Sequence, residues 1–212
     1  MTFPAKFGLY GILTDPPMGY KQLASTMVRQ GVRVLQLRMK TAAKTAVMRT
    51  GRALKKITAG TGTVFIVNDS PEIALEIGAD GVHLGQGDTP YGQAREILGP
   101  DAIIGLSTHS VSQARAACAL GPDYIAMGPV FSTSTKQNPD PVIGLSGLKE
   151  ILEIATVPTV AIGGIEHSNV AQVLRAGISN VACIGCISEA KDPAQSLKQL
   201  LEMIEKHHAA RV

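Results

Sequence analysis

The sequence predicts a single α/β domain, residues 1–212, folded as a (β/α)8 TIM barrel. Short apolar runs rich in β-branched residues alternate with segments of helical periodicity, and this order continues along the whole chain. Runs such as TVFIV and TVAI are almost entirely aliphatic or β-branched, as expected when both faces of a parallel sheet are covered. A length of 212 residues with 45% hydrophobic content suits one compact barrel.

The predicted elements alternate strictly, beginning with a strand. Eight strands are expected at Leu9–Leu13, Val32–Leu37, Thr63–Val67, Gly81–Leu84, Ala102–Leu106, Tyr124–Met127, Thr159–Ile162 and Val181–Ile184. Eight helices are expected at Tyr20–Gln30, Lys44–Ile57, Pro71–Ile77, Tyr91–Leu98, Ser112–Leu120, Gly147–Ile154, Asn169–Ala176 and Pro193–Lys206. A doubly wound open sheet is the alternative, but the segment after the first strand, TDPPMG, has no G-x-G-x-x-G. In a barrel, the residues that follow each strand meet at one rim, where active sites lie.

Composition excludes several classes of protein. The net charge is only +3 and no long run of Lys or Arg occurs, so we expect no nucleic-acid partner. No apolar stretch reaches the ~18 residues of a membrane helix, and the N-terminus does not resemble a secretion signal. The 3 cysteines are too few for a disulfide framework. The sequence therefore predicts a cytoplasmic protein without a membrane partner, and it makes no prediction of oligomeric state.

Polar side chains gather at the end of the second strand. Period-2 alternation directs Gln36, Arg38 and Lys40 to one side and Leu37 and Met39 to the other. A solvated strand end is the alternative, but an unpaired amide such as that of Gln36 is costly within an apolar strand. Two cations and an amide are thus expected to face the same way.

Two carboxylates follow neighbouring strands. Asn68 and Asp69 directly follow the third strand, and Asp88 follows the fourth. Close carboxylates at a phosphate-binding rim suit one Mg²⁺, which binds one or two carboxylates together with phosphate oxygens and water. Taken singly, Asp69 could be a helix N-cap and Asp88 a turn residue. His83 could be an orienting or core histidine as readily as a functional one.

Hydroxyl groups and glycines mark a second anion site. The loop FSTSTK, which contains Thr133, Ser134, Thr135 and Lys136, follows the sixth strand. Glycines follow the seventh and eighth strands, where barrels frequently bind phosphate: Gly163, Gly164 and Gly185. A surface linker or a simple tight turn is the alternative for each segment alone.

Cys183 and Cys186 form a C-x-x-C pattern, which redox enzymes and zinc sites also use. The first thiol lies on a predicted buried strand without a helix N-terminus, and no second cysteine pair occurs. Two inert, buried thiols are therefore expected.

Together these segments resemble the thiamine phosphate synthase family over nearly the whole chain. The similarity is carried by motifs in the same order at the strand ends: LYGILTD at 9–15, QLRMK at 36–40, ND at 68–69, ADGVHLGQGD at 79–88, GLSTH at 105–109, DYIAMGPVFSTSTK at 123–136 and AIGGI at 161–165. The resemblance implies a transferase of thiamine biosynthesis. It implies joining of hydroxymethylpyrimidine diphosphate to hydroxyethylthiazole phosphate, or its carboxylate form, with release of pyrophosphate and the help of one Mg²⁺ per subunit.

The resemblance also implies roles for individual residues. The pyrimidine diphosphate would be held by Gln36, Leu37, Arg38, Met39, Lys40, Asn68, Ser107 and Lys136. Of these, the expected catalytic residues are Arg38, Lys40 and Lys136. The thiazole phosphate would contact Thr133, Ser134, Thr135, Gly163, Gly164, Ile184 and Gly185, and the metal ligands would be Asp69 and Asp88.

Three positions depart from the family's usual pattern, which has Glu at Met39, Ser at Gly185 and Arg at Ser70. The loss of Ser at position 185 removes a hydroxyl contact, although the backbone N–H of Gly185 can still donate. Two other functions fit parts of the pattern. A thiazole tautomerase would need the thiazole phosphate pocket but not the full diphosphate and Mg²⁺ set, and a non-catalytic phosphometabolite sensor could dispense with the cations.

Overall fold

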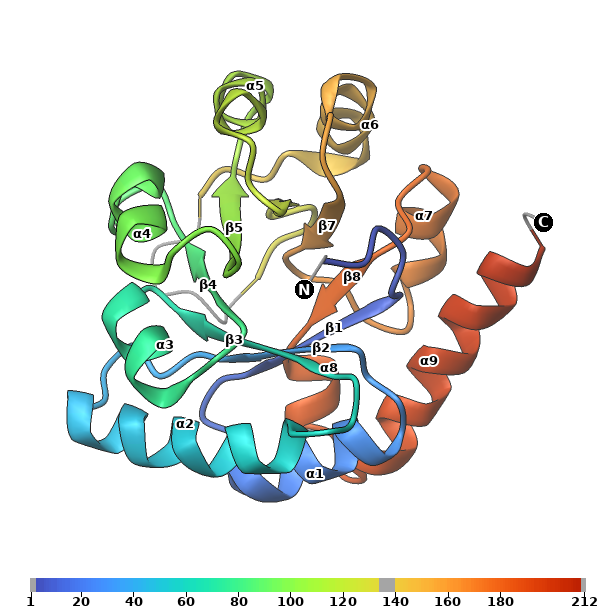
Figure 1. Ribbon diagram of the computed structural model, residues 1–212. Helices are drawn as coiled ribbons and strands as arrows, with labels where there is room; N and C mark the ends of the chain where they lie inside the picture. Colours follow the sequence, from blue (N-terminus) through green and yellow to red (C-terminus); the bar gives the residue numbers. More distant parts are fainter. Residues whose placement is uncertain (1–2, 134–139, 211–212) are drawn as a thin grey trace.

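The predicted barrel is confirmed by the computed structural model, which describes residues 3–133 and 140–210 (Figure 1). Within these ranges eight parallel strands close into a barrel, each pairing with the next and β8 pairing with β1. Helices form a ring around the strands (Figure 1). Three predicted site residues, Ser134, Thr135 and Lys136, lie outside the described residues.

Most predicted elements are within one or two residues of those observed. The strands are β1 Leu9–Leu13, β2 Val34–Leu37, β3 Val64–Asn68, β4 Gly81–Leu84, β5 Ile103–Thr108, β6 Tyr124–Met127, β7 Thr159–Ile162 and β8 Val181–Cys183. The helices are α1 Tyr20–Arg29, α2 Lys44–Thr58, α3 Pro71–Ile77, α4 Tyr91–Leu98, α5 Val111–Leu120, α6 Gly144–Ile154, α7 Val170–Arg175, α8 Gly185–Ser188 and α9 Pro193–Ala209.

Two differences affect the site. The strand β5 continues to Thr108, so Ser107 lies within the strand rather than after it. The short helix α8 was not predicted, because 4 residues are too few to show a helical period.

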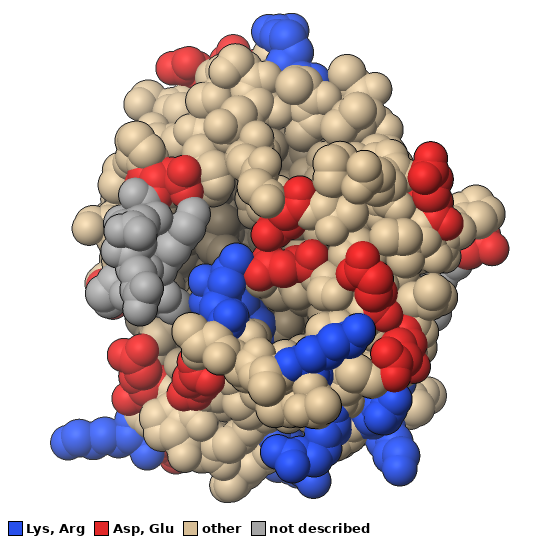
Figure 2. Space-filling model, turned by 90° about the vertical axis from the view of Figure 1, so that its left-hand side faces the viewer, with Lys and Arg blue, Asp and Glu red and all other residues tan. Residues whose placement is uncertain are grey.

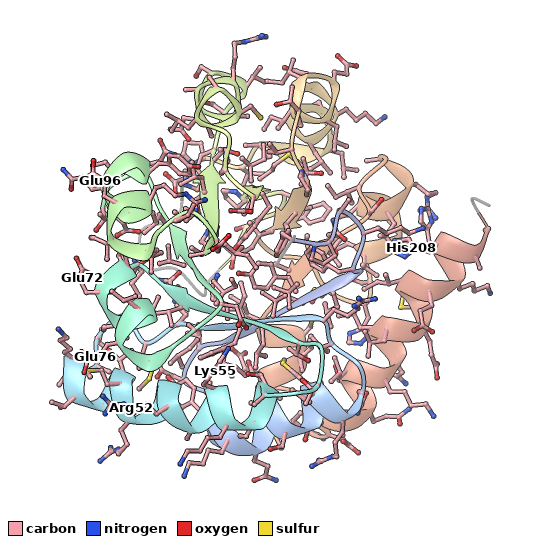
Figure 3. All side chains as sticks on the ribbon, in the orientation of Figure 1. Arg52, Lys55, Glu72, Glu76, Glu96 and His208 are labelled. Carbon is pink, nitrogen blue, oxygen red and sulfur yellow. The ribbon has the colours of Figure 1, made fainter. Side chains whose placement is uncertain are left out.

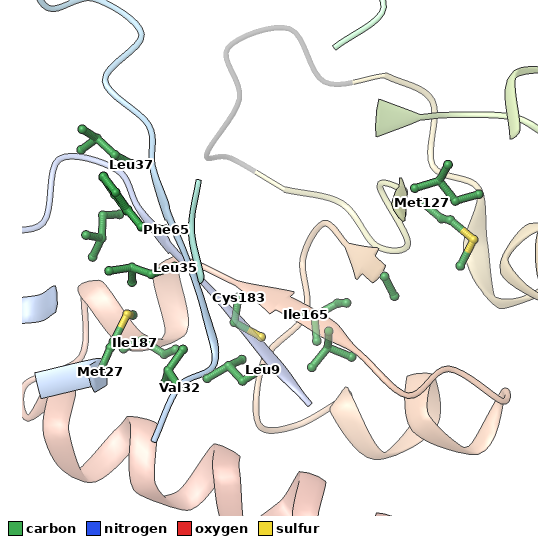
Figure 4. Packing of buried hydrophobic residues seen from close by; sticks show 14 of the residues in the cluster. Leu9, Met27, Val32, Leu35, Leu37, Phe65, Met127, Ile165, Cys183 and Ile187 are labelled. Carbon is green, nitrogen blue, oxygen red and sulfur yellow. The ribbon is translucent and has the colours of Figure 1, made fainter. Parts of the chain in front are cut away.

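Apolar side chains pack in two layers because strand residues point alternately inward and outward. The larger layer fills the space between sheet and helices and includes Leu9, Leu35 and Phe65 (Figure 4). The smaller layer fills the barrel interior and includes Ile12, Val64 and other inward residues. The interior is therefore a packed core rather than a pore, and ligands must bind above it.

The N-terminal segment closes the amino-terminal end of the barrel. Phe3 and Phe7 belong to the interior layer, and the Phe3 ring stacks on Tyr124 with ring centroids 4.5 Å apart. The buried Asn180 holds the segment in place, since its Oδ1 accepts hydrogen bonds from the backbone N–H groups of Phe7 and Gly8 at 2.7 and 3.1 Å. This leaves the opposite rim, at the carboxyl ends of the strands, as the open end.

Ion pairs on the outer ring join α2 to α3 and to the loop after α3. Arg52 on α2 contacts Glu76 on α3 at 3.0 Å (Figure 3). Lys55, also on α2, contacts Asp80 at 2.6 Å. An exposed pair such as Arg52–Glu76 contributes about 0–1 kcal/mol. No helix in the described part of the chain is long and apolar enough to span a membrane.

Candidate active site

A cavity of about 1010 Å³ opens at the carboxyl rim of the barrel. Figure 2 shows a hollow at which both basic and acidic side chains gather. Twelve of the predicted site residues line this cavity: Gln36, Arg38, Lys40, Asn68, Asp69, Asp88, Ser107, Thr133, Gly163, Gly164, Ile184 and Gly185. They come from segments spread along most of the chain, as expected for a barrel active site.

Two of the described site residues, Leu37 and Met39, have side chains that point away from the cavity. Leu37 is buried in the layer between sheet and helices, and Met39 packs against that layer. The alternation expected along QLRMK is therefore confirmed, since Arg38 and Lys40 line the cavity while their neighbours face the helices. The Glu-to-Met departure at position 39 consequently removes no charge from the cavity.

The carboxylate of Asp69 lies between a cation and a second carboxylate. Lys40 Nζ contacts Asp69 Oδ2 at 2.7 Å. Partial burial raises the pKa of Asp69, the Lys40 ammonium opposes this shift, and the neighbouring Asp88 carboxyl reinforces it. Asp69 also has a φ of 69°, in the left-handed region that few non-glycine residues adopt. The backbone is thus held in an uncommon conformation at the point where this carboxylate enters the cavity.

Asp88 is oriented by its own loop, because its Oδ2 accepts a hydrogen bond from the backbone N–H of Gly85 at 2.7 Å. No cluster of three or more His, Cys, Asp or Glu side chains suited to a metal occurs among residues 3–133 and 140–210. The pair Asp69 and Asp88 nevertheless fits Mg²⁺, which prefers hard oxygen ligands and takes its remaining ligands from substrate phosphate and water. A divalent cation would also relieve the repulsion that raises the pKa of Asp69.

The turn after β7 requires both of its glycines. Gly163 and Gly164 have φ values of 100° and 61°. A Cβ on Gly163 would lie 2.4 Å from Pro129 Cβ, and one on Gly164 would lie 2.4 Å from the Ser132 carbonyl oxygen. The close contact brings this turn against the segment that leads into the FSTSTK loop, so two of the predicted phosphate-binding segments are adjacent.

Gly185 is different, because nothing in its surroundings demands glycine. A Cβ there would meet only the Glu189 carboxylate, at 3.5 Å or more. Its φ is not in the left-handed region. The space around Gly185 can therefore accommodate a serine side chain.

The predicted burial of the two thiols in the C-x-x-C pattern is confirmed for Cys183 and wrong for Cys186. Cys183 is buried beside Leu9 and Ile165 (Figure 4). Cys186 is only half-buried and lines the cavity, because α8 turns the chain back toward the rim. The interaction with Cys186, together with burial, raises the pKa of Cys183, and the interaction with Cys183 lowers the pKa of Cys186.

Sequence reasoning missed two tyrosines in the barrel interior. Tyr10 and Tyr124 share a hydrogen bond between their hydroxyl groups at 2.7 Å. Tyr124 also contacts His83, and burial is the main cause that lowers the pKa of His83 to about 4. Each tyrosine lies in an apolar strand, where a ring is most simply read as core. Only the inward alternation shared with Gln36 could have suggested a polar contact.

Asp15, His109 and Ser70 each have a hydrogen-bond partner in the structure. The Asp15 carboxylate accepts a hydrogen bond from Tyr20 OH at 2.7 Å, and Tyr20 has its pKa raised to about 12 by burial and by this carboxylate. His109 lines the cavity, with its Nδ1 2.5 Å from the Gly128 carbonyl oxygen. Ser70 caps α3, since its Oγ accepts from the backbone N–H of Ile73. Asp15 and Ser70 thus have structural partners outside the cavity.

A rim cavity with two cations, a carboxylate pair and a glycine turn defines a TIM-barrel enzyme suited to phosphorylated small molecules. Comparison with known proteins narrows this class. The profile of the family described as "Thiamine monophosphate synthase" matches residues 10–187. The chain belongs to this family.

Relatives and solved structures agree with the family match. The chain is 39% identical over 203 residues to the thiamine-phosphate synthase of Shouchella clausii (strain KSM-K16), covering 94% of this chain and 97% of the relative. It is 40% identical over 197 residues to the thiamine-phosphate synthase of Methanoregula boonei, covering 91% of each chain. The structure of thiamine phosphate pyrophosphorylase from Pyrococcus furiosus matches with a TM-score of 0.86 and 33% identity, covering 96% of this chain and 98% of the other.

Proposed function

We propose that this protein is a thiamine-phosphate synthase. It would join 4-amino-2-methyl-5-(diphosphooxymethyl)pyrimidine to 4-methyl-5-(2-phosphooxyethyl)thiazole, or the carboxylate form of that thiazole, giving thiamine phosphate and pyrophosphate. The observation that carries the proposal is the convergence of Arg38, Lys40, Asp69 and Asp88 with the Gly163-Gly164 turn on one cavity. A diphosphate site and a second phosphate site in a single cavity suit a reaction that unites two phosphorylated substrates.

The diphosphate side of the cavity would stabilise the leaving group. Arg38 and Lys40 supply positive charge where the departing pyrophosphate gains negative charge, and the sequence suggests Lys136 as a third cation. When bound by Asp69 and Asp88, one Mg²⁺ per subunit would neutralise further charge on the phosphate oxygens. Lys40 would then exchange its contact with Asp69 for one with the diphosphate.

The pyrimidine itself would be oriented by Gln36, Asn68 and Ser107. Gln36 is only 2% exposed, and its amide lies at the inner end of the cavity. Its Nε2 already donates to Tyr10 OH, so Oε1 is left as an acceptor, and a heterocycle with an N–H group is the ligand that suits this position.

The thiazole phosphate would bind on the glycine side of the cavity. Backbone N–H groups of Gly163, Gly164 and Gly185 can approach a phosphate closely, and Thr133 lies at the same cavity. The sequence adds Ser134 and Thr135 from the same loop. Ile184 would contribute an apolar wall next to the phosphate.

We propose a dissociative substitution, in which the C–O bond to pyrophosphate breaks before the thiazole nitrogen attacks the methylene carbon. The chain's part in this route is to hold both substrates in one orientation and to stabilise developing charge. No protein nucleophile is required.

The free cysteines are consistent with a reducing, cytoplasmic location, which we also propose.

The test is an assay of pyrophosphate release with both phosphorylated substrates and Mg²⁺. Matched reactions omit each substrate in turn or add a chelator. A synthase releases pyrophosphate only when both substrates and the metal are present. Conversion of the thiazole carboxylate alone would instead indicate a tautomerase, and binding of either substrate without turnover would indicate a sensor.

A further inference from the structure

A continuous chain of hydrogen bonds crosses the barrel interior and begins and ends at the cavity. Gln36 Nε2 donates to Tyr10 OH at 2.9 Å, and Tyr10 OH lies 2.7 Å from Tyr124 OH. Tyr124 OH lies 3.0 Å from His83 Nδ1, and His83 Nε2 lies 2.8 Å from Ser107 Oγ. The five side chains come from five different strands: β2, β1, β6, β4 and β5.

Burial and close packing hold these five hydrogen-bonded side chains in place. Tyr10, Gln36, His83 and Tyr124 are all at most 8% exposed, so their polar atoms must bond to one another. A Cβ at Gly105 would lie 2.0 Å from Tyr124 Cζ, so glycine in β5 leaves the space that the Tyr124 ring occupies. The His83 ring stacks on Tyr124 at 5.6 Å with an interplanar angle of 20°.

With the Gln36 amide nitrogen facing Tyr10, the later hydrogen bonds can all run in one direction. An amide nitrogen can only donate, so the Tyr10 oxygen accepts from Gln36. Tyr10 is 1% exposed, so its own proton needs a buried acceptor, and among the described residues the other partner of this hydroxyl is Tyr124. The Tyr124 hydroxyl then donates its hydrogen bond to His83 Nδ1. Burial, with no carboxylate hydrogen-bonded to the ring, favours the neutral imidazole. A neutral ring that accepts at Nδ1 carries its proton at Nε2, which donates to Ser107 Oγ.

The hydroxyl proton of Ser107 is therefore not used by any hydrogen bond between these five side chains. Its oxygen accepts from His83, and the side chain lines the cavity. The Ser107 hydroxyl can then donate only to another acceptor, such as a ligand in the cavity. Turning the Gln36 carboxamide by ~180° would reverse every bond, because an amide oxygen only accepts; the proton of Ser107 would then bond to His83.

We propose that the hydrogen bonds of this network all run in one direction, from Gln36 to Ser107. Tyr10, Tyr124 and His83 are then positioning residues, which make the Ser107 hydroxyl a donor to the ligand. That this ligand oxygen belongs to the pyrimidine diphosphate rests on the proposed function. The polarity favours an anionic oxygen at Ser107, because an anion has only acceptors. It also leaves Gln36 Oε1 as an acceptor for a ligand N–H.

The tautomer of His83 tests the polarity without any substrate. Protein labelled with ¹⁵N at histidine is studied by long-range ¹H–¹⁵N NMR at pH 8. The signals of His83, one of 5 histidines, are assigned by their loss in the His83→Gln variant. A proton on Nε2 supports the proposal. A proton on Nδ1 means that the chain runs the opposite way and overturns it.

A second variant tests whether Gln36 sets the direction. The carboxylate of Gln36→Glu can only accept, so it should reverse the chain and move the His83 proton to Nδ1. The matched control is Gln172→Glu, which makes the same chemical change at the same cavity but outside the five hydrogen-bonded side chains. A His83 tautomer that stays the same in Gln36→Glu would overturn the proposal.

Kinetics test the positioning role. Tyr124→Phe removes one hydroxyl and should raise KM for the pyrimidine diphosphate about fivefold, as expected for one neutral hydrogen bond, while KM for the thiazole phosphate stays unchanged. Tyr10→Phe serves as a second variant if Tyr124→Phe folds poorly. Equal changes in both KM values would indicate a merely structural role. A wild type that makes no thiamine phosphate would refute the proposed function, while the tautomer result would still decide the polarity.

Discussion

His83 should make the stability of the protein depend on pH. The ring is 8% exposed, and its pKa is lowered from 6.5 to about 4. Burial is the largest cause; Asp88 raises the pKa, whereas His109 and Lys40 lower it. The unfolded chain takes up a proton on this residue near pH 6.5, but the folded chain does not until about pH 4. Stability that is fully present above pH 6.5 is therefore lost as the pH falls toward 4.

The size of the effect follows from the two pKa values. A shift of one pKa unit corresponds to ~1.4 kcal/mol, so the complete loss is about 3 kcal/mol. Between pH 8 and pH 5 the expected loss from His83 is about 2 kcal/mol, because the folded ring is still mostly neutral at pH 5. This is a substantial part of the ~5–15 kcal/mol that stabilises a typical domain.

The assay is urea unfolding of the wild type and His83→Gln at both pH values. Far-ultraviolet circular dichroism is the appropriate probe, because the chain contains no Trp. We expect the wild type to lose about 2 kcal/mol more than His83→Gln on going from pH 8 to pH 5. The comparison uses the difference between pH values, so a constant destabilisation by the substitution cancels. Equal losses in the two proteins would refute the argument, since His83 would then titrate alike in the folded and unfolded states.

Three further predictions concern the proposed metal and substrate sites. Asp69→Asn and Asp88→Asn should each raise the Mg²⁺ concentration needed for half-maximal activity, whereas Asp15→Asn, outside the cavity, should not; an unchanged metal dependence in both would refute the carboxylate assignment. Lys136→Ala should lower turnover ~100-fold or more and weaken use of the pyrimidine more than the thiazole, and an unchanged rate at saturating substrates would remove Lys136 from catalysis. Gly185→Ser should lower KM for the thiazole phosphate about fivefold by adding a hydroxyl; a raised KM would mean that the residue is not a phosphate contact.

The rim residues were predictable because their positions depend on strand ends. Asp69 directly follows β3 and Asp88 lies in the loop after β4, and parallel strands bring such positions to the same rim. The division of QLRMK into cavity and core sides was predictable for a similar reason, since period 2 is fixed by the backbone. Fold and rim therefore required only local patterns.

The tyrosine chain was not predictable in this way. Tyr10 and Tyr124 are 114 residues apart, and nothing local marks either hydroxyl as polar rather than as part of a buried ring. The helix α8, which brings Cys186 to the cavity, was missed because it is only 4 residues long. These features depend on which strands face each other across the closed barrel.

The sequence alone determined the barrel, its open rim and the identities of the charged groups there, because strand and helix periods and turn glycines act over a few residues. Only the tertiary structure decided which groups meet. It paired Lys40 with Asp69, brought the Gly163-Gly164 turn against the start of the FSTSTK loop, and joined five strands through one chain of hydrogen bonds. The physical reason is closure: distances across a barrel are set by how eight strands pair, and no short segment contains that information.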